Sequence, residues 1–437
     1  MLKEKATLVF PLANLALSSF VLLMTTNIIA NVSVVEANVL ADSTVAVKRY
    51  TNMHAWMHPG IFAELWDMGQ ISYGSEAVVK AIHQIRPDFK ALLYRNIRAI
   101  YRHREDEWQM ALNNDWILKD ENGQLVYSTV YRTNYLVDIG NSEYQKWVAN
   151  WIKEKIDGLD GVFADESVSV VASEHFWRTS APPINPRTGD FWKNHEIGQA
   201  LVAIHNEIKK AISPKLLVCN GIFEGCRFWR MQNRYNEFVA NSPLDGIMSE
   251  GLWYQYEEVW MSEEQWLKCL EFLIFVQDNF LMGTNRVFEI VCAVEKATGE
   301  DEQLPPGCTK EQMVEYAFAS TLLGIKTNQN YLGLAVNPSF MKDVVQPLHD
   351  IDLGPPLGDY YKIKGTHVYA RDFTNIKVLV NPTEDTFEVD LGMRVINVQP
   401  HTGVGVDQET GEILFGMRAQ MCFGGGGACA NFVLCCF

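Results

Sequence analysis

Two segments of the chain place an acidic residue directly after a short apolar run. Residues 157–166 read DGLDGVFADE, so Asp165 and Glu166 follow a run that begins at Gly161. Residues 245–253 read DGIMSEGLW, and Glu250 follows a similar run that begins at Gly246. Hydrolysis of an acetal needs one carboxyl group to protonate the leaving oxygen and another to attack the anomeric carbon or to activate water. We therefore predict Asp165 and Glu250 as a catalytic pair that could cleave glycosidic bonds.

The alternation of side chains along a strand decides which acid of the first segment faces the site. In a strand over 161–165, Gly161, Phe163 and Asp165 point one way and the intervening residues, with Glu166, point the other. Only one of the two acids can then face the same side as the rest of the site, and we favour Asp165. The simpler alternative is that either acid, or Glu250, caps a helix or binds an arginine.

Polar and aromatic residues at the ends of other expected strands could bind a sugar. A pyranose has hydroxyl groups and an apolar face, so it needs hydrogen-bonding groups and aromatic rings together. Trp56 and Trp253 are the expected stacking residues. The complete set of expected substrate-binding residues is Trp56, His58, Asp67, Tyr94, Asn96, Glu166, Asn220, Trp253 and Glu289.

No motif for a metal or a cofactor stands out. The ten histidines form no H-E-x-x-H, and no C-x-x-C, G-x-S-x-G or phosphate-binding glycine loop is present. His54 and His58 are four apart, but in a strand-like segment where this spacing is too wide for a shared ligand. We expect a chemistry that uses neither metal nor cofactor.

The elements that must position these residues follow an alternating pattern. From about residue 48 to 335, apolar β-branched runs alternate with stretches of helical period, which is typical of βαβ units. Eight such units favour a (β/α)₈ TIM barrel, an α/β fold, over an open sheet with a G-x-G-x-x-G turn, which this sequence lacks. The expected strands are 51–57, 64–72, 90–94, 161–165, 216–219, 246–249, 286–293 and 327–332, and the clearest helices are 75–85, 142–156, 195–212, 228–240, 263–278 and 311–323.

The longest insertions follow the third and fourth expected strands, at 96–141 and 167–194. Both should therefore lie at the face of the barrel where active sites form. After the sequence LGPPLG at 353–358, short alternating runs predict a small antiparallel β-domain. The expected division is a barrel over 42–352, a β-domain over 353–420 and a disordered tail over 421–437 that is rich in glycine and cysteine.

The N-terminus has the order of a secretory signal. Lys3 and Lys5 precede an uncharged apolar stretch that lasts until Glu36, and small residues follow at Ala37 and Ala41. We expect cleavage after Ala37 or Ala41 and a secreted or extracytoplasmic protein; the alternative is an uncleaved N-terminal membrane anchor, since the stretch is long enough to span a bilayer. The formal charge of −16 and the lack of a basic run argue against nucleic acid as a partner.

The same segments resemble a known family. DGLDGVFAD at 157–165, SEGLW at 249–253 and the segments VYARDF at 368–373 and VLVNP at 378–382 are similar to a hypothetical barrel-type family of glycosyl-hydrolase-like proteins from bacteria and archaea. That family is in turn similar to the endo-α-1,4-polygalactosaminidases and, more distantly, to the α-galactosidase and α-glucosidase superfamily. The resemblance covers about 50 to 392 and implies a retaining glycosidase acting on a poly- or oligosaccharide, with Asp165 as nucleophile and Glu250 as general acid/base.

Two other functions remain open from the sequence. An exported barrel that has lost catalysis could bind a glycan without cleaving it. A metal-dependent polysaccharide deacetylase is the third candidate. A ligand-induced rise in melting temperature without release of reducing sugar would favour the binding protein, and unchanged activity in a chelator would argue against the deacetylase.

Overall fold

The computed structural model describes residues 45–51, 58–72, 74–168, 179–221, 225–230, 238–239, 241–253, 261–294 and 309–383, the single residues 385, 387 and 389, and short strands at 397–398, 405–406, 413–414 and 431–436. The expected N-terminal signal and Trp56 lie outside these residues. Within them, no helix is both long and apolar enough to cross a membrane.

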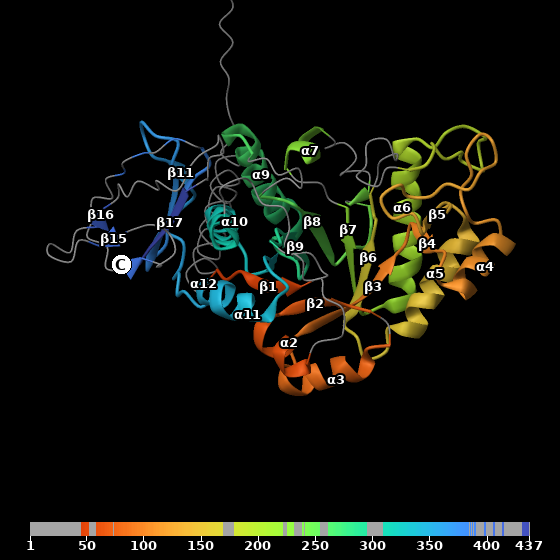
Figure 1. Ribbon diagram of the computed structural model, residues 1–437, viewed down its shortest axis with the longest axis horizontal. Helices are drawn as coiled ribbons and strands as arrows, with labels where there is room; N and C mark the ends of the chain where they lie inside the picture. Colours follow the sequence, from red (N-terminus) through yellow and green to blue (C-terminus); the bar gives the residue numbers. More distant parts are fainter. Residues whose placement is uncertain are drawn as a thin grey trace, which may run out of the picture.

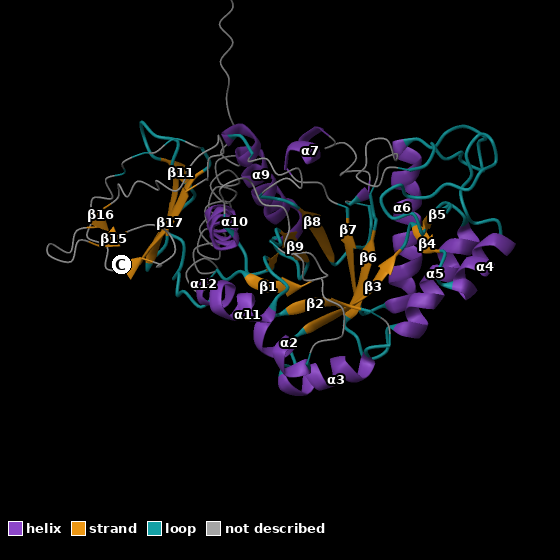
Figure 2. Cartoon of the chain, viewed as in Figure 1, coloured by secondary structure: helices purple, strands orange, loops and turns teal. Residues whose placement is uncertain are grey.

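Eight parallel strands close into a barrel with helices around it, which confirms the predicted fold (Figure 2). The strand order is β1-β2-β3-β6-β7-β8-β9-β10, and β10 pairs with β1 to close the circle. The strands are β1 Lys48–Thr51, β2 Met68–Ile71, β3 Lys90–Asn96, β6 Gly161–Asp165, β7 Leu216–Asn220, β8 Gly246–Glu250, β9 Val287–Val291 and β10 Asn330–Gly333.

The helices cover the outside of the barrel and largely match the predicted amphipathic stretches. Ser262 and Thr309 begin two of them with capping boxes, in which each side chain accepts the backbone N–H three residues on. The helices are α2 Pro59–Leu65, α3 Glu76–Ile85, α5 Ser142–Lys155, α6 Asn194–Ile212, α7 Gly225–Arg230, α9 Glu263–Val276, α10 Lys310–Gly324, α11 Pro338–Phe340 and α12 Gln346–His349, with π-helical turns at Gln277–Leu281 and Met341–Val345.

Side chains of the strands divide between two apolar clusters, as alternation requires. Val162 and Ala164 of β6 pack outward in the large core beneath the helices. Phe163 of β6 and Met248 of β8 belong to a separate cluster inside the barrel. The inner cluster consists of Tyr50, Met68, Leu92, Phe163, Val218, Met248, Val287, Val291 and Tyr331. Asp165, two residues after Phe163, therefore shares the inward face of β6.

Glycine begins both strands that end in the candidate acids because the barrel interior is crowded there. A Cβ added to Gly161 would lie 2.5 Å from the carbonyl oxygen of Leu216, and one added to Gly246 would lie 2.5 Å from Cγ2 of Val287. These distances are far below van der Waals contact, so packing requires glycine at both positions.

The first two strands differ from the prediction where they are described. Strand β1 covers 48–51, and residues 52–57 of the expected strand at 51–57 lie outside the described residues. The expected strand at 64–72 contains the end of helix α2 followed by β2 at 68–71. Strand β1 was not predicted because it begins with the charged residues Lys48 and Arg49. In the structure the Arg49 side chain donates to Asp67, which is 18 positions further along the chain.

Insertions after β3 and β6 lie next to each other. The first holds β4 Ala99–Tyr101, α4 Glu105–Asn113 and β5 Asn134–Leu136. The second bonds to it through the Ser180 N–H, which donates to the carbonyl of Tyr127 at 2.8 Å. Arg187 adds contacts to both carboxylate oxygens of Asp138, at 2.9 and 3.0 Å.

A second, antiparallel sheet follows the barrel, in the order β11-β12-β13-β17-β14. In Figure 1 it lies at the opposite side of the molecule from the β4–β5 insertion. Its strands are β11 Tyr361–Lys362, β12 Tyr369–Asp372, β13 Ile376–Asn381, β14 Asn397–Val398 and β17 Asn431–Cys436, and a separate pair joins β15 Gly405–Val406 to β16 Ile413–Leu414.

Strand β17 differs from the expected disordered tail. It pairs with β13 along six positions, from Asn431 opposite Asn381 to Cys436 opposite Ile376. The run NFVLCC carries aromatic and β-branched residues that favour strands, whereas the glycines and cysteines of the tail as a whole suggested disorder.

Two groups of polar contacts join this sheet to the barrel, one around Glu263 and one around Arg371. The Glu263 carboxylate, in the first turn of α9, accepts from Lys362 at 2.7 Å, His367 at 2.5 Å and Tyr369 at 2.6 Å. Arg371 of β12 donates to the carbonyls of Leu322, Leu323 and Ile325 at the end of α10. A cation at a helix C-terminus satisfies carbonyls that have no partner within the helix.

Candidate active site

Asp165 ends strand β6, and both of its carboxylate oxygens accept hydrogen bonds. The Tyr94 hydroxyl, from β3, donates to Oδ2 at 2.6 Å. The Asn220 side-chain amide, from β7, donates to Oδ1 at 2.9 Å. Burial raises the pKa of Asp165 above its ordinary value, and these two hydrogen bonds oppose that rise because they favour the charged form. The carboxylate is thereby fixed in orientation.

Glu250 ends strand β8, two strands from Asp165 in the barrel. Surrounding protein disfavours its charge, the nearby charge of Asp165 adds to the effect, and a hydrogen bond with Asn220 opposes it; together they raise the pKa of Glu250 to about 7. Glu250 is nevertheless an exposed residue, so a solute can reach it. Asn220, on the strand between the two acids, thus interacts with both.

Glu166 follows Asp165 and lies outside the strand, so strand alternation does not set its direction. Its backbone has a φ of +63°, which takes the chain out of the strand immediately after Asp165. The Glu166 side chain is buried, and the Arg98 guanidinium attracts it. Desolvation and the charge of Asp165 nevertheless raise the pKa of Glu166 well above its ordinary value. Glu166 therefore lies within electrostatic reach of Arg98, Asp165 and Glu250.

One acid, Glu289, and one aromatic residue, Tyr50, lie deeper in the barrel below Glu250. Glu289 of β9 is fully buried, and burial raises its pKa well above its ordinary value although Tyr50 of β1 interacts with its carboxyl. Burial and the charges of Glu289 and Glu250 raise the pKa of Tyr50 in turn, and Gln70 of β2 donates to the Tyr50 hydroxyl. Glu289, predicted as substrate-binding, is thus part of the floor beneath the acids.

Asp67 and Trp253 are held in contacts away from the acid pair, and His58 caps a helix. Asp67 precedes β2, at the other end of the barrel, where Arg49 and Arg86 bind it. Trp253 is fully buried in the core, and its indole N–H donates to Thr321 at 2.9 Å, so it offers no face to a sugar. His58 begins helix α2, where its Nδ1 accepts the N–H of Gly60 at 3.1 Å.

Asn96 has a structural role at the end of β3. It is buried, and its Oδ1 accepts the backbone N–H groups of Arg98 at 3.0 Å and Ala99 at 2.8 Å. These bonds shape the turn into β4. Of the predicted binding residues, Tyr94 and Asn220 therefore contact the acid pair.

Sequence reasoning missed Tyr50, Gln70 and Tyr101 as neighbours of the site. The first two escaped because strands β1 and β2 were placed wrongly, although Gln70 is the single polar residue in the run MGQI. Tyr101 escaped because it lies in an insertion; its hydroxyl is 3.3 Å from that of Tyr94.

No group of three or more His, Cys, Asp or Glu side chains arranged to hold a metal ion occurs among the residues that the structure describes. The polar groups around Asp165 are a phenol and an amide, which suit hydrogen bonding to a carboxylate and to sugar hydroxyls.

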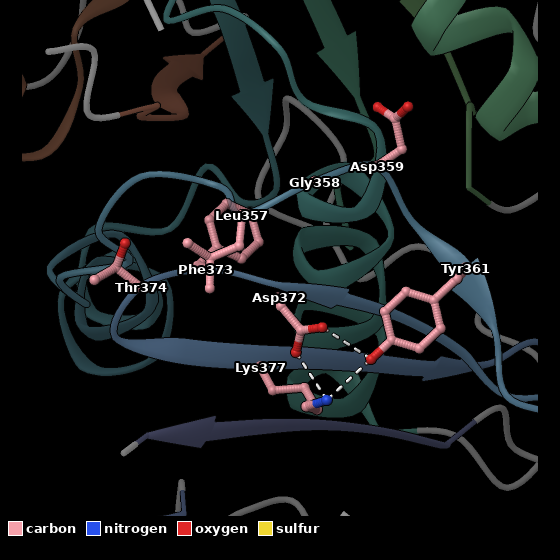
Figure 3. A pocket seen from close by; sticks show the side chains of 8 residues that line it. All are labelled: Leu357, Gly358, Asp359, Tyr361, Asp372, Phe373, Thr374 and Lys377. Carbon is pink, nitrogen blue, oxygen red and sulfur yellow. Dashed lines mark hydrogen bonds and ion pairs between the residues drawn. The ribbon is translucent and has the colours of Figure 1, made fainter. Parts of the chain in front are cut away.

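A separate depression of about 570 Å³ lies on the small sheet, with Tyr361, Asp372 and Lys377 at its centre (Figure 3). These three side chains satisfy one another: Tyr361 donates to Asp372 at 2.9 Å, and Lys377 lies 2.9 Å from the Tyr361 hydroxyl and 2.8 Å from Asp372. The carboxyl of Asp359 points away from them in Figure 3. The depression therefore lacks a pair of available acids, and the barrel mouth remains the candidate site.

Comparison with known proteins places the chain among glycosyl-hydrolase-like proteins. A family model described as hypothetical glycosyl hydrolase family 15 matches residues 83–377. No curated protein matches the chain.

Among solved structures, the galactosidase domain of the α-galactosidase–sucrose kinase AgaSK aligns with a TM-score of 0.46 and 10% identity over 90% of this chain. This chain spans 55% of the length of that protein. The maltogenic α-amylase AmyB from Thermotoga neapolitana aligns with a TM-score of 0.43 and 10% identity, over 77% of this chain and 86% of its own. The glycoside hydrolase domain of PelA from Pseudomonas aeruginosa aligns with a TM-score of 0.41 and 12% identity, over 65% and 94%.

Proposed function

This chain belongs to hypothetical glycosyl hydrolase family 15, and we propose that it hydrolyses O-glycosidic bonds of a poly- or oligosaccharide with Asp165 and Glu250. The observation that carries the proposal is the contrast between these two carboxyls. Asp165 accepts two hydrogen bonds that favour its charged form, whereas the pKa of Glu250 is raised to about 7. Two nearby acids whose environments differ in this way are suited to opposite roles.

In the proposed retaining mechanism, Asp165 attacks the anomeric carbon while Glu250 protonates the departing oxygen. The bond from the anomeric carbon to the leaving oxygen breaks as the bond to Asp165 forms. Glu250, now ionised, then takes a proton from water, and that water displaces Asp165 from the sugar. Asn220 interacts with both acids and would keep them in register through the two steps.

A direct test incubates the purified protein with soluble starch, dextran, galactomannan and α-1,4-linked galactosaminan. Release of reducing sugar by the natural chain and not by Asp165→Asn would support the proposal, and NMR of the first product should show the anomer of the substrate. An inverted first product would reject the retaining mechanism. A rise in melting temperature with a glycan but without hydrolysis would favour the glycan-binding barrel instead.

We also propose that the protein works outside the cytoplasm, on the strength of its cationic and apolar N-terminus. N-terminal sequencing of the exported protein should find cleavage after Ala37 or Ala41. Full-length protein that stays in the cytoplasm would contradict the proposal, and full-length protein in the membrane would indicate an uncleaved anchor.

A further inference from the structure

Tyr101 lies one hydrogen bond beyond the residues that hold Asp165. Its hydroxyl is 3.3 Å from the Tyr94 hydroxyl, which donates to Asp165. Burial raises the pKa of Tyr101, and the charge of Asp165 contributes to this rise, as expected for a ring close to the acid. Tyr101 ends β4, and the next two residues, Arg102 and His103, are exposed.

A second aromatic ring, that of the exposed His103, stacks on the ring of Tyr101. His103 is stacked on it, with ring centroids 5.5 Å apart and an angle of 16° between the planes. The Arg104 guanidinium lies 4.7 Å from the centre of the same ring. Arg104 N–H donates to the Tyr101 carbonyl at 3.0 Å, which closes the turn and fixes the position of His103. His103 itself is exposed, so its imidazole can be reached.

A third ring belongs to the neighbouring turn. The Arg102 N–H donates to the Thr133 carbonyl at 2.8 Å, and Tyr101 pairs with Asn134 in β5. This pairing brings the segment with Tyr131 beside the turn that carries His103. Tyr131 is 49% exposed and adjoins Val130, which is 44% exposed. We name Tyr101, His103 and Tyr131 the aromatic shelf.

We propose that the aromatic shelf is a sugar-binding subsite that continues from the catalytic pair over the β4–β5 insertion, so that the substrate is a glycan chain of several residues rather than a small glycoside. The proposal rests on the proposed function. The exposed rings of His103 and Tyr131 offer apolar faces, and the partly buried Tyr101 ring connects His103 to Tyr94 and Asp165. Rings that are held in place offer such faces at little entropic cost, and pyranose rings stack on them. The second insertion is bonded to the first at Tyr127.

The test measures binding in native gels that contain soluble starch, dextran, galactomannan or α-1,4-linked galactosaminan, with Asp165→Asn as the parent so that no probe is consumed. At least one gel should retard the parent. His103→Ala and Tyr131→Ala should each weaken this retardation about fivefold in apparent affinity, as expected for one stacking contact. His103→Phe should restore it, because it keeps a ring. His195→Ala, which removes an exposed imidazole from α6, is the matched control and should behave as the parent.

The shelf is rejected if both alanine variants bind like the parent, or if none of the four probes retards the parent. Kinetics with catalytically competent protein separate the two proposals. Hydrolysis that requires Asp165 but has the same KM for an oligosaccharide in the shelf variants would reject the shelf and keep the glycosidase. Retardation that depends on His103 in a natural chain that releases no reducing sugar would keep the shelf and reject the glycosidase.

Discussion

The acidic residues at the two ends of the barrel have different hydrogen-bonding and ion-pair partners. At the N-terminal end, Asp67, Asp160 and Asp245 directly precede β2, β6 and β8, and each accepts a backbone N–H from the preceding strand of the barrel: from Arg49 at 2.6 Å, Ala91 at 2.8 Å and Leu217 at 2.8 Å. Each also contacts a basic side chain, from Arg49 and Arg86, His83 and Lys209 respectively. These acids hold strands together.

At the C-terminal end, no Lys, Arg or His side chain forms an ion pair with Asp165 of β6 or Glu250 of β8 among the residues that the structure describes. Burial raises the pKa of Asp165, and the pKa of Glu250 rises to about 7. Burial would also raise the pKa of Asp67, but the backbone and side chain of Arg49, with Arg86, lower it below its ordinary value. One end of the barrel thus stabilises carboxylates, and the other holds them in a state that costs stability and suits reaction with a substrate.

The largest expected effect is the loss of turnover in Asp165→Asn. The change removes the attacking charge at nearly constant shape, so kcat should fall at least about 10³-fold. Steady-state rates on the best polysaccharide would measure it. Asp245 precedes β8 at the end of the barrel opposite Glu250. Asp245→Asn should therefore keep kcat within about threefold of the natural value, because the residue makes no contact with the reacting groups. Equal losses in both variants would break the comparison.

Glu250→Gln should show a smaller loss that depends on the leaving group. Because Glu250 acts as an acid, hydrolysis of poor leaving groups should fall about 10² to 10⁴-fold, while activated aryl glycosides should be affected far less. In the natural protein, activity should decline as pH rises through about 7, because the acid is lost as it ionises. The pH profile of kcat for Glu250→Gln should lack this decline. If the decline persisted in this variant, a group other than Glu250 would be responsible for it.

Asp67→Asn should destabilise the fold without touching catalysis. It leaves Arg49 and Arg86 without their shared carboxylate and should lower the free energy of unfolding by about 2 kcal/mol at neutral pH. Because the pKa of Asp67 is lowered in the folded state, this stability is present above its ordinary value of 3.8 and is lost as pH falls through the lower folded value. Urea unfolding at several pH values would show the difference from the natural chain shrinking below about pH 4.

Asp88→Asn is the matched control for that experiment. Asp88 contacts the same arginine, with 3.5 Å between Arg86 Nε and its carboxylate, but its side chain is 79% exposed. Its replacement should change stability by no more than about 0.5 kcal/mol. A loss as large as that of Asp67→Asn would mean that the charge of Arg86, and not the buried bonding of Asp67, is what matters.

The smallest effect has the opposite sign. The pKa of Asp165 is raised in the folded state, so its contribution to stability diminishes as pH rises from the unfolded to the folded value, and the charged form opposes folding at neutral pH. Asp165→Asn should therefore be as stable as the natural chain at pH 7, or more stable by up to about 1 kcal/mol. Urea unfolding would measure this, and a clear loss of stability would show that Asp165 is a structural acid.

The barrel could be predicted from the sequence because its signals are local. Apolar β-branched runs and helical periods recur in order, and β6 was predicted at its observed residues because Asp-Gly precedes it and acids follow it. Strand β1 could not be predicted in this way. Its sequence KRYT looks polar, and only the contact of Arg49 with Asp67 shows why a strand can begin with two cations.

The positions of Asp165 and Glu250 at the ends of their strands were predictable for the same reason, and their neighbours were not. Strand alternation favoured Asp165 over Glu166 from the sequence, but the φ of +63° at Glu166 shows that the alternation ends at Asp165. By contrast, Trp253 stands next to Glu250 in sequence and looks like a stacking residue, but the packing of α9 and α10 buries it and gives its indole N–H a partner in Thr321. Tyr101 shows the reverse case: it is distant from the acids in sequence, but the position of β4 brings its hydroxyl to that of Tyr94 in β3.

The capping of α10 by Arg371 also bears on how the chain is made. Every residue of α10 from Met313 to Gly324 is buried, and the carbonyl that Arg371 binds most closely belongs to Ile325, 46 positions earlier in the chain. During synthesis, the carbonyls at the end of α10 therefore lack Arg371 as a partner until β12 has left the ribosome. Because this contact needs both α10 and β12, the end of the helix and the small sheet should stabilise each other.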